Sequence, residues 1–346
     1  TSLLITGCQQ IPINESNRNF VDDSIDKQNL VIDLKKQEKI ISYHSDIWSY
    51  ILVNSSYTSD SLDEQTLMYM NRHLQDLDKF KEFLNDSYYF IFFVIEELEK
   101  AKLPIELAFL PYIESNYDPF SISSSGAVGM WQFMPRTGRT YNLERSWWNE
   151  DRHDPFKSTT AAIKYLKYLY ERFDQDLYLT LAAYNAGPSF LDRQIKRNQR
   201  RGLNTDYWSL DLPIQTRNYV PKFIAIKELI INSDQYDIEL PFIPYEPVVA
   251  KIEIPGQVEI LTLSEYLNIK PELLYKLNAG YTKWASAPSE KSVFYIPIEQ
   301  YDYFQTSENP FSDSNQINWI SHTVESGDSL WSLARKYDTE VRIIRE

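Results

Sequence analysis

One glutamate in an apolar stretch is the strongest candidate for chemistry in this sequence. Glu114 follows the apolar run 107–113 (Leu-Ala-Phe-Leu-Pro-Tyr-Ile), where a carboxylate is costly unless it has a task. A carboxyl group in an apolar wall keeps its proton to higher pH, and a general acid that works near neutrality needs that property. Glu114 is therefore the candidate general acid.

The other acidic residues nearby fit structural roles better. Asp118 precedes Pro119, and this pair is typical of a turn. Asp151 and Asp154 flank His153, but the chain has only 4 histidines and no spaced set of ligands. We therefore expect a site with a single working carboxyl group, no metal ion and no cofactor.

Three further segments bring polar and aromatic side chains that could surround a substrate. They are 123–135 (Ser-Ser-Ser-Gly-Ala-Val-Gly-Met-Trp-Gln-Phe-Met-Pro), 183–187 (Ala-Tyr-Asn-Ala-Gly) and 216–220 (Thr-Arg-Asn-Tyr-Val).

The elements that must position these groups are mostly helices. Helical spacing of apolar residues predicts two or three amphipathic helices between Asp46 and Lys102. We further expect a short helix over 129–134 that stops near Pro135, and helices over 176–186 and 216–231. Another helix carries 161–169, capped by the run Ser158-Thr159-Thr160.

The composition changes near Tyr236, where several prolines mark a linker and a new domain. Strands are predicted over 248–254 and 292–297, with short helices over 261–267 and 271–277 between them. A second polar linker comes next. Residues 320–337 then repeat the start of this layout, which indicates diverged repeats.

The bulk composition limits the possible functions. A chain of 346 residues has room for two or three domains. A net charge of -14 argues against nucleic acid as a partner, because phosphate binding needs clustered Lys and Arg. The 25 Tyr and 8 Trp suit stacking on sugars, although ordinary core positions explain them equally well. The single cysteine excludes an intrachain disulfide, and no apolar run is long enough to span a membrane.

Taken in this order, Glu114-Ser115 and the three segments resemble the lytic transglycosylases with a goose-lysozyme-like fold. The sequences Trp-Gln-Phe-Met-Pro (131–135) and Trp-Asn-Glu-Asp-Arg (148–152) resemble the membrane-bound transglycosylase D group. The C-terminal pieces resemble LysM modules, which are small βααβ folds that bind N-acetylglucosamine chains. The resemblance covers roughly 45–298 and the C-terminal fragment.

The resemblance implies a mainly α protein with a lysozyme-like catalytic domain and small α+β modules. The expected parts are the end of a lipoprotein signal peptide (1–8), a polar tether (9–45), an N-terminal helical region (46–98), the transglycosylase domain (99–235), a LysM-like domain (245–300), a linker (301–319) and a truncated LysM module (320–346).

The family cleaves the β-1,4 bond between N-acetylmuramic acid and N-acetylglucosamine in peptidoglycan and leaves a 1,6-anhydromuramic end. The resemblance implies that Glu114 acts first as acid and then as base, assisted by the 2-acetamido group of the substrate. The substrate-binding residues that it implies are Ser123, Gln132, Met134, Tyr184, Asn185 and Tyr219.

The region around Cys8 resembles a bacterial lipobox, because an apolar run and Gly7 precede the cysteine. In such proteins the signal peptide is cut before the cysteine and the thiol is acylated. The residue after it is Gln9, not Asp, which by resemblance indicates the outer membrane. The expected location is therefore the periplasm, with a lipid anchor in the outer membrane and peptidoglycan glycan strands as the partner.

Two alternatives stay open on the sequence alone. One is a lysozyme-type hydrolase that adds water, and the other is a peptidoglycan-binding lipoprotein without catalytic activity. The sequence also departs from the family at one position, since Gln215 stands where a glutamate usually precedes the threonine. An amide keeps the hydrogen-bonding capacity but loses the charge.

Overall fold

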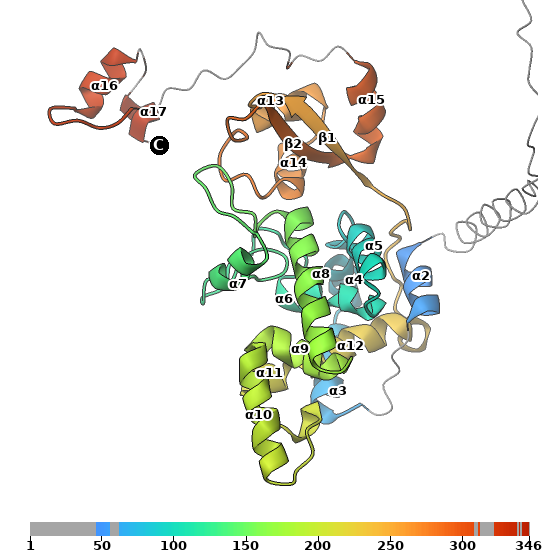
Figure 1. Ribbon diagram of the computed structural model, residues 1–346. Helices are drawn as coiled ribbons and strands as arrows, with labels where there is room; N and C mark the ends of the chain where they lie inside the picture. The colour runs from blue at the N-terminus through green and yellow to red at the C-terminus, as the bar shows by residue number, and fades with distance from the viewer. Residues whose placement is uncertain are drawn as a thin grey trace, which may run out of the picture.

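Helices make up most of the described chain, as the sequence predicts (Figure 1). The computed structural model describes residues 46–55, 62–307, 311, 322–337, 339 and 341–345. The predicted tether 9–45 and Cys8 lie outside the described residues. The same holds for the part of the predicted linker 301–319 that follows residue 307, except residue 311. Within the described part, no helix is both long enough and apolar enough to cross a membrane.

The N-terminal helices are α2 (Ile47–Asn54), α3 (Glu64–Leu74), α4 (Leu77–Asn85) and α5 (Ile91–Ala101). The next helices along the chain are η1 (Ile105–Phe109), α6 (Leu110–Glu114), α7 (Pro135–Thr140), α8 (Pro155–Arg172), α9 (Leu177–Ala186), α10 (Pro188–Arg200), η2 (Tyr207–Ser209), α11 (Ile214–Arg217), α12 (Tyr219–Ile231) and η3 (Ser233–Tyr236). The C-terminal part holds β1 (Val249–Pro255), α13 (Ile260–Tyr266), α14 (Pro271–Leu277), β2 (Lys291–Pro297), η4 (Ile298–Gln300), α15 (Tyr301–Thr306), α16 (Leu330–Lys336) and α17 (Val341–Arg345).

The N-terminal helices share one hydrophobic core with α6, α8, α9, α10 and α12. Buried residues from Ile47 in α2 to Ile230 in α12 belong to a single continuous cluster. The linker after η3 returns along α2, where the Trp48 indole donates to the carbonyl of Pro241 (2.6 Å) and Tyr245 stacks on Tyr50 (3.9 Å between ring centroids). The predicted N-terminal region is therefore packed as part of the same body.

The helix predicted over 216–231 is broken into α11 and α12 at Asn218. Pro221 has no N–H to donate to the carbonyl of Arg217, and its ring crowds that carbonyl. The free carbonyls accept another donor, because the hydroxyl of Tyr207 donates to Thr216 O (3.0 Å) and Arg217 O (2.7 Å). The break leaves Tyr219 as the first residue of a helix that is buried on most sides.

The prediction of a short helix over 129–134 is wrong. Residues 121–134, which we name the 121–134 loop, form turns that isolated bridges join, with Val128 paired to both Ile122 and Phe133. Gly129 (φ +80°) and Gln132 (φ +49°) have left-handed backbone conformations, which cannot continue a right-handed helix. The helix α7 begins at Pro135, whose fixed φ suits a first helical position.

The predicted cap of the next helix is also displaced. Asp154 caps α8, since its carboxylate accepts from the backbone N–H groups of Phe156 and Lys157 (2.9 Å each). Pro155 comes next as the first helical residue. Ser158 lies one turn inside the helix, where its buried hydroxyl donates to the carbonyl of Asp154 (2.6 Å).

The four elements predicted over 248–297 are present in the expected order, and we call this unit the βααβ module. Its antiparallel strands pair from Val249 with Pro297 to Pro255 with Lys291. Alternate residues of β1 and one side of each helix form a separate small core. Leu277 at the end of α14 instead belongs to the core of the helical body.

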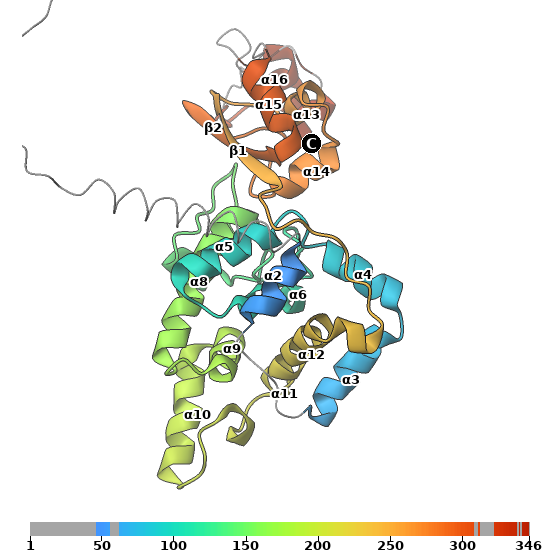
Figure 2. The same cartoon turned by 90° about the vertical axis from the view of Figure 1, so that its right-hand side faces the viewer.

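The βααβ module stands at one end of the helical body, and α10 lies at the opposite end (Figure 1, Figure 2). The stacked rings of Phe156 in α8 and Tyr295 in β2 join the two parts (3.7 Å between centroids). Backbone hydrogen bonds from residues 148–150 to 280–282 join them as well.

The packing at Gly129 predicts a large loss of stability on substitution. A Cβ atom at Gly129 would lie 1.9 Å from the backbone oxygen of Arg152, while a Cβ at Gly126 (φ +84°) would meet nothing within 4 Å. Gly126→Ala should therefore lower the free energy of unfolding by about 1 kcal/mol through its backbone conformation alone. Gly129→Ala should lower it by about 3 kcal/mol or more, because the clash is added. Denaturant unfolding compares the two variants, and equal losses would contradict the packing described for Gly129.

Candidate active site

Glu114 is the last residue of α6 and lies against the first residue of α12. The wall behind it is apolar, since Leu110, Pro111 and Tyr112 are buried. The hydroxyl of Tyr219 donates a hydrogen bond to Oε1 of Glu114. Tyr219 is itself buried, and 105 positions separate the two residues in the chain. The structure therefore brings these two predicted site residues into direct contact.

The environment raises the proton affinity of Glu114. Burial raises the pKa of its carboxyl group from the ordinary 4.5 to about 7, even though the hydrogen bond from Tyr219 and the positive charge of Lys222 act to lower it. Burial also raises the pKa of Tyr219 well above its ordinary range. At neutral pH the tyrosine is thus a hydrogen-bond donor, and a large share of Glu114 carries its proton.

Tyr184 lies near this pair and holds the 121–134 loop. Its ring is on α9, and its hydroxyl donates to the backbone oxygen of Trp131 (2.8 Å). Burial, followed by the charge of Glu114, raises the pKa of Tyr184 well above its ordinary range. The hydroxyl of Ser115, next to Glu114, donates to the backbone oxygen of Met130 (2.8 Å). Two consecutive carbonyls of the loop are thus tied to the surroundings of Glu114.

The other predicted residues of the loop have partners within it. The Ser123 hydroxyl accepts from the backbone N–H of Ala127 (2.9 Å) and bonds to the Ser125 hydroxyl (3.0 Å). The amide of Gln132 donates to the carbonyl of Gly129 (2.9 Å). Met134 is exposed and precedes α7. No hydrogen bond joins Ser123, Gln132 or Met134 to Glu114.

Asn185 connects α9 to α11. Its side-chain oxygen accepts from the hydroxyl of Thr216 (2.8 Å). Gln215, the position at which the sequence departs from the family pattern, is exposed beside this contact.

The acidic residues that could be mistaken for a second catalytic group or a metal site have structural partners. Asp118 is exposed, and its carboxylate accepts from the backbone N–H of Phe120 (2.9 Å). Asp151 pairs with Lys157 (2.8 Å), and Asp154 caps α8. Within the described residues, no cluster of three or more His, Cys, Asp or Glu side chains has an arrangement that could hold a metal ion.

Sequence reasoning assigned no individual role to three residues of this region: Ser115, Lys222 and Arg152. Lys222 lies three positions after Tyr219 on α12, so helical spacing could have indicated it. Ser115 is adjacent to the candidate acid, but its residue type alone does not predict a contact with the 121–134 loop. Arg152 holds that loop from a distant segment, and nothing in its local sequence predicts the contact.

Two family models match the chain. The transglycosylase SLT domain matches residues 93–206, which contain Glu114, the 121–134 loop and Tyr184. The LysM domain matches residues 322–346. The class is thus a protein with an SLT domain and a LysM domain.

The comparisons with individual proteins narrow this class. The chain is 30% identical to the membrane-bound lytic murein transglycosylase D of Escherichia coli K12 over 323 residues, which are 88% of this chain and 70% of that protein. It is 33% identical to the membrane-bound lytic murein transglycosylase F of Alcanivorax borkumensis over 108 residues, 30% of this chain and 22% of that protein. The chain therefore belongs to the membrane-bound lytic murein transglycosylase D family.

Among solved structures, the 70 kDa soluble lytic transglycosylase of Escherichia coli matches with a TM-score of 0.34. It is 17% identical, and the match covers 53% of this chain and 32% of that chain. With a TM-score this low, the similarity carries no structural argument.

The contact between Tyr219 and Glu114 predicts the direction of a pH effect. A general acid must be protonated, so activity should fall as the pH rises through about 7, the pKa of Glu114. Tyr219→Phe removes a donor that stabilises the carboxylate, so the pKa rises and the alkaline limb of the kcat/KM profile moves to higher pH. We also expect kcat to fall roughly 10-fold or more.

Tyr184→Phe serves as the matched control for this prediction. Its hydroxyl donates to a backbone carbonyl and not to Glu114. In Tyr184→Phe, the alkaline limb of the kcat/KM profile should lie at the same pH as in the wild type. A limb that moves to lower pH in Tyr219→Phe would contradict the assignment of Tyr219 as a donor to the acid.

Proposed function

We propose that this chain cleaves the β-1,4 bond between N-acetylmuramic acid and N-acetylglucosamine in peptidoglycan and forms a 1,6-anhydromuramic end. The observation that carries the proposal is the partly buried contact of Glu114 with Tyr219, in a setting that raises the pKa of this one carboxyl group to about 7. The similarity to the Escherichia coli relative, a lytic murein transglycosylase, supports the same reaction.

One residue performs both proton transfers in this proposal. Glu114 donates its proton to the glycosidic oxygen as the bond to C1 breaks, and the leaving sugar departs as an alcohol. The carbonyl oxygen of the 2-acetamido group stabilises C1 from the other face. The C6 hydroxyl then attacks C1, the acetamido group is released, and the carboxylate of Glu114 takes the hydroxyl proton. Such substrate assistance is a known exception to the use of two carboxylates.

The proposed binding residues surround this step. Gln132 and Met134 would line the saccharide groove, with the exposed thioether of Met134 available for apolar contact. Tyr219 would hold the acid, and Tyr184 would bind near the acid or the acetamido group. Asn185, which already accepts from Thr216, keeps its amide N–H groups for a sugar.

Ser123 would bind the acetamido group through its hydroxyl proton. Its oxygen already accepts from the Ala127 N–H, and a hydroxyl that accepts one hydrogen bond can still donate one.

Each domain has its own part in this function. Residues 99–235 form the transglycosylase domain, and 46–98 extend its core. The βααβ module within 245–300 would brace the catalytic domain, and the truncated LysM module at 320–346 would contact the glycan, as its match to the LysM domain supports.

We further propose that Cys8 carries a lipid anchor in the outer membrane and that the enzyme acts in the periplasm. The apolar run before Gly7 and Cys8 supports this proposal. Cys8→Ser should remove lipid labelling and release the protein from the membrane fraction into the soluble fraction. Fractionation and labelling with a radioactive fatty acid measure both effects, and unchanged labelling would refute acylation at Cys8.

Glu114→Gln should abolish cleavage and preserve glycan binding, because the amide keeps the shape and cannot transfer the proton. The expected loss of kcat is at least about 100-fold, within the range for a removed general acid. Asp118→Asn, an exposed turn residue four positions away, is the control and should keep nearly full activity.

Mass spectrometry of digested peptidoglycan separates the alternatives. Wild-type enzyme should release anhydromuramic products. Reducing-end muramic products would identify a hydrolase that adds water. Binding without any product in the wild type would identify a peptidoglycan-binding protein without catalytic activity.

A further inference from the structure

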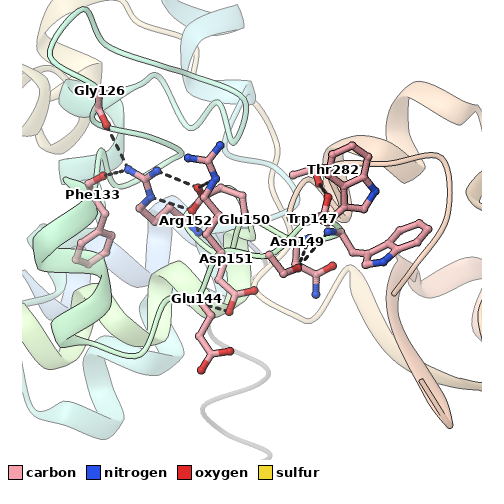
Figure 3. Close-up of polar contacts among 12 residues, drawn as sticks. Gly126, Phe133, Glu144, Trp147, Asn149, Glu150, Asp151, Arg152 and Thr282 are labelled. Carbon is pink, nitrogen blue, oxygen red and sulfur yellow. Dashed lines mark hydrogen bonds and ion pairs between the residues drawn. The ribbon is translucent and has the colours of Figure 1, made fainter. Parts of the chain in front are cut away.

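A buried ion pair lies between the 121–134 loop and the βααβ module (Figure 3). Nε and Nη2 of Arg152 donate to the two carboxylate oxygens of Glu150 at 2.9 Å each, and both residues are buried. Such a two-point contact fixes the plane of the guanidinium group. A buried pair of this kind is better evidence for a defined geometry than for added stability.

The rest of Arg152 holds the 121–134 loop. Nη1 donates to the carbonyls of Gly126 (3.2 Å) and Phe133 (3.0 Å), one before and one after Val128 in the loop (Figure 3). The backbone oxygen of Arg152 lies where a Cβ of Gly129 would be. One residue therefore contacts the loop at three places.

The same loop is tied to the candidate active site on its other side. Its carbonyls at Met130 and Trp131 accept from Ser115 and Tyr184. A displacement of the loop at Arg152 would therefore move Gln132 and loosen contacts beside Glu114.

The segment that carries Arg152 is docked on the βααβ module. The N–H of Glu150 donates to the carbonyl of Gly280 (2.9 Å), and the N–H of Thr282 donates to the carbonyl of Trp148 (2.8 Å). The Thr282 hydroxyl donates to the carbonyl of Trp147 (2.9 Å), as Figure 3 shows. Residues 147–150 thus pair with 280–282 much as two short strands do.

Aromatic side chains reinforce this docking. The rings of Trp148 and Trp284 meet edge to face (5.8 Å between centroids). The ammonium group of Lys283 lies 3.9 Å from the centroid of the Trp147 ring. The contact between the parts is therefore specific in both backbone and side chains.

We propose that Arg152 is a positioning residue for the transglycosylase reaction, and that the βααβ module supports it by docking on residues 147–150. Arg152 and Glu150 hold the 121–134 loop in the geometry that binds the glycan. The module thus contributes to catalysis through this contact, separately from any glycan that it binds. The proposal rests on the proposed roles of Gln132 and Glu114.

The kinetic test uses Arg152→Lys in the full chain, with a soluble peptidoglycan tetrasaccharide as the substrate. Lysine keeps the charge but cannot bond two oxygens of Glu150 and two carbonyls at once. A displaced loop should raise KM about 10-fold, and the alkaline limb set by Glu114 should stay in place. A merely structural role would reduce the folded fraction, which lowers the apparent kcat and leaves KM unchanged.

The docking is tested by a matched pair of glycine variants in the βααβ module. A Cβ at Gly280 would lie 2.8 Å from the Cβ of Asp154 across the interface, while a Cβ at Gly256 (φ +75°) would contact nothing within 4 Å. Gly280→Ala should raise KM about 3-fold for the tetrasaccharide. Gly256→Ala strains the same module away from the interface and should leave KM unchanged.

The proposal is overturned if KM in Arg152→Lys equals that of the wild type, or if Gly280→Ala and Gly256→Ala have the same KM. These outcomes differ from a failure of the proposed reaction, which appears in the products. Wild-type enzyme that releases reducing ends would refute the transglycosylase chemistry, while the KM comparisons would still decide the role of Arg152.

Discussion

The geometry of this protein depends on keeping one carboxyl group largely away from water without leaving it unpartnered. Burial raises the pKa of Glu114 to about 7, and a buried carboxylate with no donor would cost several kcal/mol. The hydroxyl of Tyr219 meets that need with one hydrogen bond. Because the two residues are 105 positions apart, the contact requires α6 and α12 to be packed against a common core.

The break between α11 and α12 also helps to position Tyr219 for its contact with Glu114. Pro221 interrupts the helix and places Tyr219 at the start of α12, and the freed carbonyls accept from Tyr207. On the other side of the break, Thr216 donates to Asn185 at the end of α9. The helix break thus connects the segment of Tyr219 to the segment of Tyr184, and both tyrosines surround one acid.

The sequence predicted those features that depend on local pattern. The apolar run before Glu114, the helix over 177–186 and the elements of the βααβ module all arise from residue types at regular spacing. The turns at 129–134 were missed because Gly129 is packed against the backbone of Arg152, which lies in a distant segment. The cap at Asp154 is a local signal, since Asp followed by Pro is typical of a helix start, and the prediction placed the cap at the Ser158-Thr159-Thr160 run instead. The hydrogen bond from Arg152 to the carbonyl of Phe133 joins residues 19 positions apart, so no local sequence pattern predicts it.

Gln215 stands where the family pattern has a glutamate, and its exposure indicates whether the loss of that charge disables the site. The residue lies on α11 and faces solvent, whereas its neighbour Thr216 is buried and holds Asn185. The side chain that links α11 to the site is therefore that of Thr216, which the family pattern retains. A charge at an exposed position is screened by water and salt, so it changes the proton affinity of a buried acid only weakly. The amide at 215 thus leaves the pKa of Glu114 governed by burial and by Tyr219.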